Sequence, residues 1–294
     1  MKNYNATLFF KTKSTLSEGP LWVPSDRRLF WVDIEQMKIH SSNLVGEHQV
    51  WSTKRKVSFI VPTQWPNVFI IGLQGELAKF NAQTGDIETL IKIESDKPNN
   101  RCNDAKADHL KRLWFGTMHI DCIPKQGALY CLNHNLILTK EIKDLTIANG
   151  MGWSKNNQWM YFIDSEDRNV KAFSLDDQGN LNDSRIIISA PKNELPDGMC
   201  VDSKGNLWVA FWGGARVGCY DSSTGQQLVE VKVPAPNVTS CTFGGDDLKT
   251  LFITTARQGL TEAQLNEFPL SGSIFECRPG IDGSLPFAFH LKNE

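Results

Sequence analysis

The sequence lacks the features that mark several large classes of protein. No run approaches the roughly 18 apolar residues of a membrane-spanning helix, and no block of basic residues is present. Lysine and arginine number 31 against 33 aspartates and glutamates, which gives a formal net charge of −2. We therefore expect neither nucleic acid nor a membrane surface as a partner. The N-terminal stretch MKNYNATLFFKTKSTLSEG also lacks the apolar core and cleavage site of a secretory signal.

Three familiar kinds of reactive site are missing as well. The seven cysteines are an odd number, lie far apart and include no C-x-x-C pair, a pattern typical of reduced thiols in a cytoplasmic protein. The six histidines form neither H-x-H nor H-E-x-x-H, so a histidine zinc site is not indicated. Without a G-x-S-x-G motif, covalent serine catalysis is disfavoured. We expect a cytoplasmic location and mostly buried cysteines.

The sequence does contain a repeat of 40 to 48 residues. In each unit one polar residue precedes a short run of aromatic and branched residues, such as NVFIIGL or NLWVAFW. The residues in this slot are Glu18, Ser58, Asn103, Asn149, Asp197 and Ser240. Units of this length with about four short β-runs are typical of propeller blades. We predict an all-β fold, a single six-bladed β-propeller over residues 1–294. A β-sandwich would not explain the recurring polar slot.

Three local features add detail to this prediction. An open ring would leave a blade edge unpaired, so residues 6–12 should pair with the last blade near residues 273–278. Thr261 and Gln264 fit a capping box and predict one short helix. Tryptophans at the repeated aromatic positions are expected in the core between blades rather than on a sugar-stacking platform; they are residues 22, 31, 114, 153, 159 and 208.

The polar slot predicts a metal site, because the innermost strands of a propeller line its channel. Glu18, Asn149 and Asp197 would then face one another at a channel mouth, and two carboxylates there need a cation or a proton. All-oxygen ligands suit a hard divalent ion: we expect Ca²⁺ first, with Mg²⁺, Mn²⁺ or Zn²⁺ as alternatives. The plainer alternative is that these residues cap strand starts and bind channel water. The glycine after each should permit a sharp turn; these are Gly19, Gly150 and Gly198.

A guanidinium and an amide share this rim in the third repeat. Arg101 and Asn103 would form a pocket for a polyhydroxylated or acidic substrate. The plainer interpretation of the same two residues is an arginine in a salt bridge and an asparagine in a turn. Asp104 is expected to brace the backbone or the residues that hold the ligand, rather than to touch the substrate. A metal in an open site can polarise an ester carbonyl while a carboxylate acts as base, so ester-type hydrolysis is the expected reaction class.

Several ordered motifs resemble one protein family. EGP-W, NNR-ND-K-D, GTM, QGALY, ANG--WS, YFIDS, PDGMC-D--GNLWVA, VTSCTFGG and ITTARQG are similar to motifs of the regucalcin (senescence marker protein)/gluconolactonase family, which includes luciferin-regenerating-enzyme-like proteins. The resemblance implies a divalent metal held by Glu18, Asn149 and Asp197, and hydrolysis of sugar lactones. It also implies substrate contacts by Arg101 and Asn103, with Asp197 serving as both metal ligand and general base.

Two positions depart from the family pattern. Asp121 stands at the acidic lid position after GTM, where regucalcin-like members carry glutamate, and we count it as a substrate residue; Ala105 replaces the usual glycine of NDGK. The shorter carboxylate alters the fit of gluconolactone in particular. We expect a metal-dependent sugar lactonase, as a monomer or weak dimer. The alternatives are a noncatalytic calcium-binding scaffold, or a hydrolase acting on other lactones or organophosphate esters.

Overall fold

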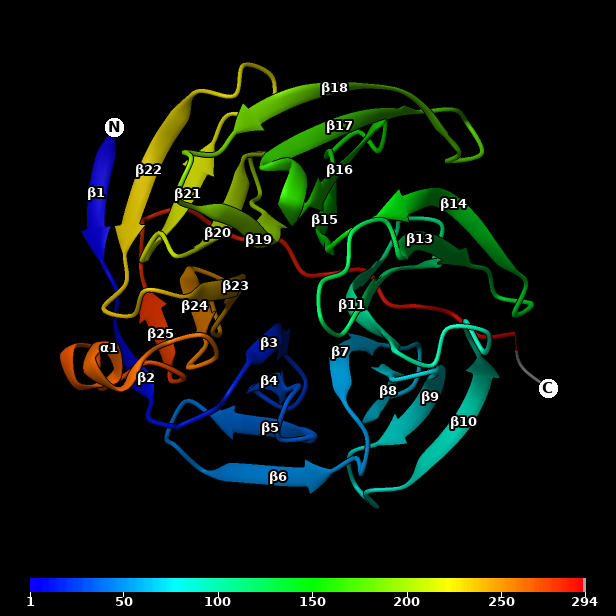
Figure 1. Cartoon of the computed structure of the whole chain (residues 1–294), viewed down its shortest axis with the longest axis horizontal. Helices are drawn as coiled ribbons and strands as arrows, with labels where there is room; N and C mark the ends of the chain where they lie inside the picture. Colours follow the sequence, from blue (N-terminus) through cyan, green and yellow to red (C-terminus); the bar gives the residue numbers. More distant parts are fainter. Residues whose placement is uncertain (293–294) are drawn as a thin grey trace.

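The computed structural model describes residues 1–292 and confirms the six-bladed β-propeller (Figure 1). Within these residues six sheets surround a central axis, and the four strands that each blade has in common run antiparallel to their neighbours. The innermost strands are β3 (Ser17–Val23), β7 (Val57–Pro62), β11 (Asn100–Ala107), β15 (Ala148–Trp153), β19 (Leu195–Val201) and β23 (Val238–Gly244). The second strands are β4 (Arg28–Asp33), β8 (Val68–Leu73), β12 (Leu113–His119), β16 (Trp159–Asp164), β20 (Leu207–Trp212) and β24 (Thr250–Thr255).

The outer half of each blade completes the sheet. The third strands are β5 (Lys38–Asn43), β9 (Glu76–Asn81), β13 (Gly127–Leu132), β17 (Asn169–Leu175), β21 (Arg216–Tyr220) and β25 (Ile274–Cys277). The outermost strands are β6 (His48–Ser52), β10 (Ile87–Lys92), β14 (Leu138–Leu145), β18 (Leu181–Ser189), β22 (Gln227–Lys232) and β2 (Thr7–Phe10). A 3₁₀ turn, η1 (Ser165–Asp167), follows β16.

The hydrophobic core is divided among the six spaces between neighbouring blades. Each of six buried clusters joins residues of two adjacent sheets. Strands with both faces covered need apolar residues throughout rather than in alternation, which explains runs such as VFIIGL and LWVAFW. Four of the predicted core tryptophans are almost fully buried: Trp22, Trp31, Trp114 and Trp208. Trp153 differs, because it also lines a cavity in the channel.

The two ends of the chain close the ring as predicted. Strand β2 pairs with β25 in the last blade, with Thr7 opposite Glu276 and Leu8 opposite Phe275. The sequence did not predict β1 (Lys2–Asn5), which adds to the fifth blade in parallel with β22. The expected capping box is also present, since the Thr261 hydroxyl accepts the Gln264 N–H at the start of α1 (Glu262–Glu267). No helix within residues 1–292 is long and apolar enough to cross a membrane.

The innermost strands run in the same direction, so the channel has two distinct ends. Gly150 lies beside Asp197 and Gly152 lies beside Val201, an order that advances along both strands together. We call the end where these strands begin, at Glu18, Asn149 and Asp197, the front mouth. The end where they finish, at Val23, Trp153 and Val201, is the rear mouth.

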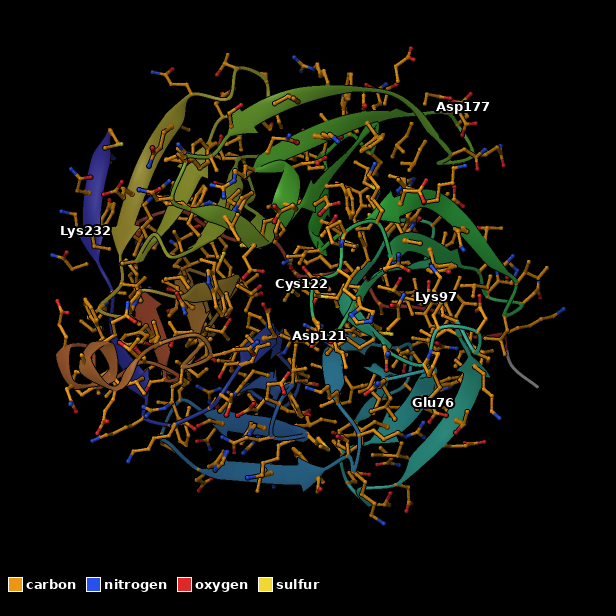
Figure 2. The ribbon with its side chains drawn as sticks, in the orientation of Figure 1. Glu76, Lys97, Asp121, Cys122, Asp177 and Lys232 are labelled. Carbon is orange, nitrogen blue, oxygen red and sulfur yellow. The ribbon has the colours of Figure 1, made fainter. Side chains whose placement is uncertain are left out.

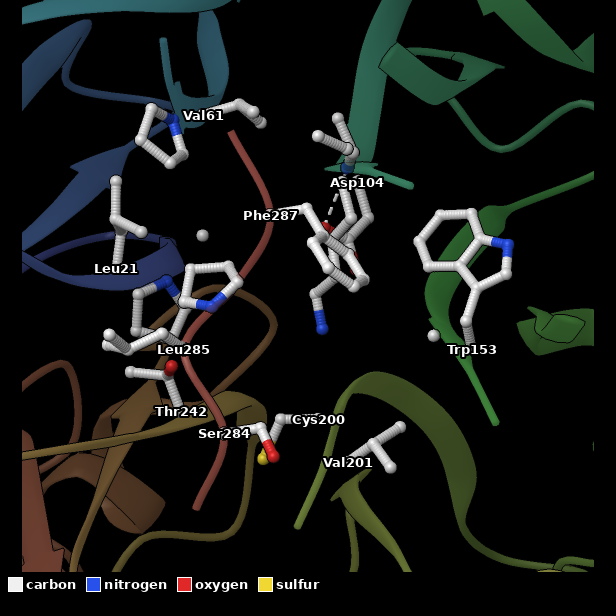
Figure 3. Close-up of a pocket in the computed structure, with 18 of the residues that line it drawn as sticks. Leu21, Val61, Asp104, Trp153, Cys200, Val201, Thr242, Ser284, Leu285 and Phe287 are labelled. Carbon is white, nitrogen blue, oxygen red and sulfur yellow. Dashed lines mark hydrogen bonds between the residues drawn. The ribbon is translucent and has the colours of Figure 1, made fainter. Parts of the chain in front are cut away.

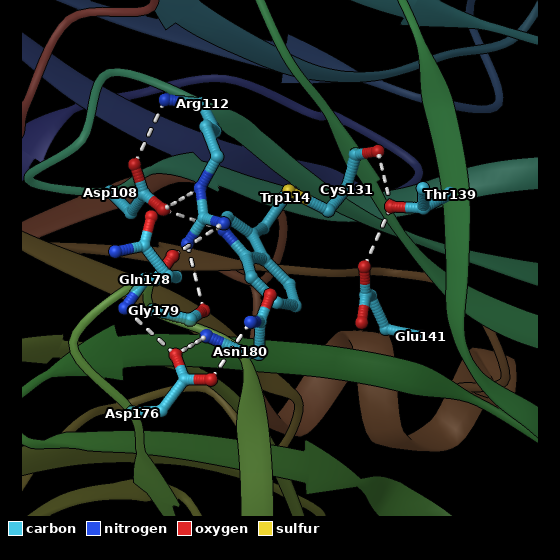
Figure 4. Close-up of polar contacts among 10 residues, drawn as sticks. All are labelled: Asp108, Arg112, Trp114, Cys131, Thr139, Glu141, Asp176, Gln178, Gly179 and Asn180. Atoms are coloured by element: carbon cyan, nitrogen blue, oxygen red, sulfur yellow. Dashed lines mark hydrogen bonds and ion pairs between the residues drawn. The ribbon is translucent and has the colours of Figure 1, made fainter.

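The rear rim is fixed by repeated polar contacts. Asp108 follows β11, and its Oδ2 accepts hydrogen bonds from Arg112 Nε (2.7 Å) and Trp114 Nε1 (2.9 Å) (Figure 4). Arg112 then donates to the Gly179 carbonyl of the next blade, at 2.8 Å. Asp202 after β19 repeats the pattern, accepting from Trp208 Nε1 at 3.0 Å. An aspartate six residues before a buried tryptophan therefore holds the rear ends of two blades.

Candidate functional site

The front mouth brings together the three predicted metal ligands. Glu18, Asn149 and Asp197 are each at least nine-tenths buried, and each lies near the start of its innermost strand. Burial raises the pKa of Glu18 well above its ordinary value of 4.5, and the Asp197 and Asp104 carboxyls raise it further. Burial also raises the pKa of Asp197, although the neighbouring Asn149 amide lowers it. The convergence predicted from the repeat is therefore present.

Aspartates at the ends of the second strands position two of these residues. Asp33 ends β4, and its carboxylate accepts the backbone N–H groups of Thr15 (2.9 Å) and Leu16 (3.2 Å), just before Glu18. Asp164 ends β16 and accepts the N–H groups of Thr146 and Ile147 just before Asn149, at 2.8 and 2.9 Å. Sequence reasoning assigned these aspartates no role, although both stand at the same repeated position, in FWVDI and YFIDS.

Ser165 is a second supporting residue that the sequence analysis missed. Its hydroxyl accepts a hydrogen bond from Asn149 Nδ2 at 3.0 Å and donates to the Pro196 carbonyl at 2.7 Å. The contact fixes the position of Asn149 Nδ2, and the same side chain also hydrogen-bonds the Asp197 carboxyl. It also ties β15 to β19 immediately before Asp197. A serine after a strand carries no sequence signal for this role.

The glycines of the slot serve two different purposes. Gly19 has φ +54°, so the expected turn needs a residue that adopts the left-handed region easily. Gly150 and Gly198 have no positive φ within the described residues, although the strand pairing is irregular at both positions. A Cβ at Gly150 would lie 2.5 Å from the Asp197 carbonyl oxygen, and one at Gly198 would lie 2.1 Å from Ser240 Oγ. These two glycines let neighbouring innermost strands approach closely.

The donor atoms at the front mouth fit a hard divalent cation. Glu18 and Asp197 are buried, and neither forms an ion pair within residues 1–292. Among residues 1–292 the buried Oδ2 of the nearby Asp104 has no hydrogen-bond partner. In the described part of the chain no three His, Cys, Asp or Glu side chains form a metal-binding group. The candidate ligand set is not such a group, because its third member is the amide oxygen of Asn149 rather than a His, Cys, Asp or Glu side chain.

Arg101 and Asn103 lie beside this cluster and contact each other. Arg101 Nη1 donates to Asn103 Oδ1 at 2.6 Å and to the Cys102 carbonyl at 2.8 Å. Burial lowers the pKa of Arg101, while carboxylates including Glu18 act in the opposite direction. Asn103 Nδ2 donates to the Ala148 carbonyl at 2.8 Å and so links β11 to β15. Among residues 1–292 Arg101 has no salt bridge. Its remaining N–H groups are suited to bind a ligand.

Asp121 belongs to a loop rather than to the buried cluster. The β12–β13 loop, residues 120–126, carries Asp121 and Cys122 near the centre of the disc (Figure 2). The Asp121 side chain is exposed and lies 3.9 Å from His119 Nδ1. The loop leans toward the fourth blade, where Lys125 N donates to Thr146 Oγ1 at 3.3 Å. The predicted lid residue is therefore on a segment beside the front mouth, apart from Glu18 and Asp197.

A cavity of about 410 Å³ lies farther along the channel. Its walls include the later residues of the innermost strands, such as Leu21, Val61 and Val201, and exclude the three predicted metal ligands. Asp104 is part of its lining. The cavity is therefore a separate space toward the rear mouth, whereas the candidate metal ligands lie at the front.

Comparison with known proteins agrees with these observations. Residues 16–257 match the family model described as "SMP-30/Gluconolactonase/LRE-like region". Regucalcin of Danio rerio is 34% identical over 295 residues, covering 98% of this chain and 99% of that protein. A Bacillus subtilis protein named "Putative sugar lactone lactonase YvrE" is 32% identical, covering 97% and 98%. The crystal structure of a calcium-binding protein, regucalcin, from Agrobacterium tumefaciens has a TM-score of 0.94 at 25% identity, covering 99% and 100%.

Proposed function

The chain belongs to the SMP-30/gluconolactonase/LRE-like family, and from this premise we propose that it hydrolyses a sugar lactone to the aldonic acid with the help of a divalent cation. The observation that carries the proposal is the pair of buried carboxyls, Glu18 and Asp197, beside the Asn149 amide and the Arg101 guanidinium. The names of the B. subtilis and A. tumefaciens relatives support a lactone substrate and calcium, respectively.

The cation would be held by Glu18, Asn149 and Asp197. When bound, it would keep both carboxyls ionised and polarise the carbonyl of the lactone. Calcium accepts carboxylate and amide oxygens in flexible geometry, which favours it over zinc for this donor set. Ser165 would contribute by holding the Asn149 amide in the ligand orientation, through the contact at 3.0 Å.

Substrate binding is assigned to the polar groups beside the carboxyls. The free N–H groups of Arg101 would donate to hydroxyl or carbonyl oxygens of the sugar ring. Asn103 already uses one N–H and one lone pair within the protein, so it would both orient Arg101 and offer one further hydrogen bond. Asp121, on the exposed 120–126 loop, would reach the substrate by movement of that loop over the front mouth.

Asp197 would act as the general base of the reaction. Its carboxylate would accept a proton from water while the water oxygen bonds to the carbonyl carbon of the lactone. The ring C–O bond then breaks, and the ring oxygen takes a proton to become the hydroxyl of the aldonic acid. One water is consumed for each ring opened, and no oxidant or reductant is required.

A panel of sugar lactones tests the proposal. Purified protein would be stripped with a chelator, reloaded with Ca²⁺, Mg²⁺, Mn²⁺ or Zn²⁺, and assayed by titration of released acid at constant pH. We expect turnover of at least one sugar lactone, its loss after stripping and its recovery on reloading. Tight cation binding without turnover of any lactone would instead support the noncatalytic calcium-binding alternative, which the description of the A. tumefaciens relative as a calcium-binding protein favours.

A further inference from the structure

A groove of about 440 Å³ lies between the fourth and fifth blades on the rear face, outside the channel. Its lining includes no residue of an innermost strand. The fourth blade contributes a row across its sheet, in which Tyr161 of β16 pairs with Ala172 of β17 and Ala172 pairs with Arg185 of β18. The fifth blade contributes two turns, with Lys204 between β19 and β20 and Ser222 between β21 and β22. We call this space the blade groove.

The blade groove is distinct from the cavity in the channel, although the turn after β15 borders both. The cavity is walled by Trp153 and by residues 284–287 near the end of the chain (Figure 3). The blade groove has neither in its lining, and it shares only Ser154 and Lys155 with the cavity. A ligand could therefore enter the blade groove from the rear face without entering the channel.

The side chains that line the blade groove make it basic. Three of them are cationic, Lys155, Arg185 and Lys204, and none is a carboxylate. All three residues are exposed, and none of them forms an ion pair within residues 1–292. A cleft lined by charges of one sign focuses its field on ligands of the opposite sign. The blade groove is therefore suited to an anion.

The carboxylates beside the blade groove are occupied by other donors. Asp221 Oδ1 accepts the backbone N–H groups of Ser223 and Thr224 at 2.9 and 2.8 Å. It also accepts the hydroxyls of the same two residues, at 2.6 and 3.0 Å. Asp202 is likewise held by Trp208 and by its own turn. Neither carboxylate forms an ion pair within residues 1–292, so the cations of the blade groove stay available to a ligand.

Two aromatic rings add an apolar surface to the blade groove. Tyr161 is buried, Trp159 is partly exposed, and Arg185 Cζ lies 5.4 Å from the centre of the Trp159 ring. This cation–π contact favours one position of the guanidinium, which lowers the cost of ordering it around a ligand. The exposed part of Trp159 offers a contact for a carbon skeleton attached to the anion.

The number and geometry of the donors favour a phosphate monoester over a carboxylate. A phosphate monoester carries close to two negative charges at pH 7 and three acceptor oxygens. The guanidinium of Arg185 can bind two of these oxygens through its planar fork, while an ammonium group contacts the third. A carboxylate has one charge and two oxygens, so it would leave at least one of the three cations without a partner.

We propose that the blade groove binds the phosphate group of a small phosphate monoester. The phosphate contacts Arg185, Lys155 and Lys204, and the carbon skeleton lies against Trp159. The site is separate from the front mouth and does not depend on lactone hydrolysis.

Phenyl phosphate, phenyl sulfate and phenol test the proposal on the full chain. Their dissociation constants would be measured by ligand-observed NMR at about pH 7.5, where the phosphate has lost its second proton, before and after removal of divalent cations with a chelator. We expect phenyl phosphate to bind about tenfold more tightly than phenyl sulfate, the scale of one further charge-assisted hydrogen bond, and phenol to bind most weakly. Binding should persist after chelation. Equal binding of the phosphate and the sulfate would overturn the proposal, and so would binding that requires a cation, because it would place the ester at the front mouth.

Variants assign the binding to the blade groove. Lys204→Glu and Arg185→Gln should each weaken the binding of phenyl phosphate at least about tenfold. Lys143→Glu is the matched control, because Lys143 is exposed near the end of β14 in the third blade and does not line the groove. At an ionic strength of about 0.1 M distant charges are largely screened, so this variant should change binding less than about twofold.

Melting temperatures check that each variant is folded. Undiminished binding in folded Lys204→Glu and Arg185→Gln proteins would place the ligand elsewhere and refute the assignment. An equal loss of binding in Lys143→Glu would also refute it, because the affinity would then depend on the net charge of the protein rather than on the blade groove.

Discussion

Two of the innermost strands, β3 and β19, carry an acid at the front mouth and apolar residues toward the rear mouth. In β3 the change runs from Glu18 to Leu21, and in β19 from Asp197 to Val201. At about 3.3 Å per residue, three or four residues separate the two environments by roughly 10 to 13 Å. The front mouth concentrates buried carboxyls that form no ion pairs within residues 1–292, whereas the cavity toward the rear mouth is lined largely by apolar residues and is crossed by residues 283–290.

The difference shows how a repeated strand can carry two chemistries. Each blade supplies the backbone positions, while single substitutions in the slot decide which blades contribute oxygen ligands. Ser58 and Ser240 occupy the same slot as Glu18 but carry no charge. The slot carboxylates are thus confined to two blades, the first with Glu18 and the fifth with Asp197. The slots of the other four blades hold uncharged residues. Predictions that act on one mouth and spare the other therefore test the division.

The largest expected effect separates Asp197 at the front from Thr242 at the rear. Asp197→Asn keeps an oxygen ligand but removes the base, so turnover of a sugar lactone at saturating metal should fall roughly 10²-fold or more. Metal binding, measured by calorimetry, should be weaker yet detectable. Thr242→Val, a near-isosteric change in the wall of the cavity toward the rear mouth, should alter turnover less than about twofold, because Thr242 is not part of the front-mouth cluster and well-separated sites act nearly independently. Near wild-type turnover of Asp197→Asn would leave Asp197 as a ligand only.

Arg101 sharpens the distinction within the front mouth. Arg101→Ala should lower kcat/KM by roughly 10- to 100-fold, the scale of a lost charge-assisted hydrogen bond. Metal affinity should remain, since a guanidinium cannot ligate a cation. Arg101→Lys keeps the charge but loses the planar fork, so it should recover only part of the activity. Loss of metal binding in Arg101→Lys would show that Arg101 supports the ligand set instead.

Stability in the absence of metal tests the buried charge directly. Glu18 and Asp197 have native pKa values above their ordinary 4.5 and 3.8, so the folded protein holds protons that the unfolded chain has released. Stability of the stripped protein should therefore fall as pH rises from about 4 through the raised native values. Glu18→Gln should raise its melting temperature at pH 7 by a few degrees, at roughly 2 to 4 °C per kcal/mol.

Calcium supplies the control for this stability test. Added Ca²⁺ should raise the melting temperature of the wild type at pH 7, because a ligand that binds only the folded state stabilises it. The same addition should raise the melting temperature of Glu18→Gln less, because the amide oxygen that this substitution introduces is a weaker calcium ligand than a carboxylate. The contrary result would be a metal-free wild-type protein whose melting temperature stays constant or rises as the pH is raised above about 4. It would contradict the assignment of buried carboxyls without a cation or an ion pair at the front mouth.

The features that could be predicted from sequence are those that recur. The aromatic runs and the polar slot return every 40 to 48 residues, so they specified both the six blades and the convergence of Glu18, Asn149 and Asp197. Closure by residues 6–12 followed from the need to pair a blade edge. The role of these residues in binding metal stays a prediction, because it depends on a ligand as well as on the fold.

The features that could not be predicted occur once and depend on distant contacts. Nothing in the letters of Lys2–Asn5 indicates a parallel pairing with β22, which lies more than 200 residues away in the sequence. One wall of the cavity toward the rear mouth is formed by residues 284–287, and the stretch SLPFAFH, residues 284–290, belongs to no repeat. The close approach at Gly150 and Gly198 could not be predicted for a related reason: the residues that approach these glycines come from the neighbouring blade.

Alkylation of the cysteines should have the smallest effect on lactone turnover, and the cysteines at the two mouths differ in exposure. Cys122 is the only exposed cysteine in residues 1–292 and lies on the loop beside the front mouth, whereas Cys200 and Cys241 are buried 3.7 Å apart at the cavity toward the rear mouth. Burial raises the pKa of both Cys122 and Cys241, so neither thiol is activated as a nucleophile.

Iodoacetamide should therefore label Cys122 slowly and change lactone turnover less than about twofold, with labelling followed by mass spectrometry. Cys122→Ser should abolish that labelling and keep turnover. Strong inactivation that Cys122→Ser prevents would place a thiol in the front-mouth chemistry, and inactivation that persists in Cys122→Ser would direct attention to the rear pair.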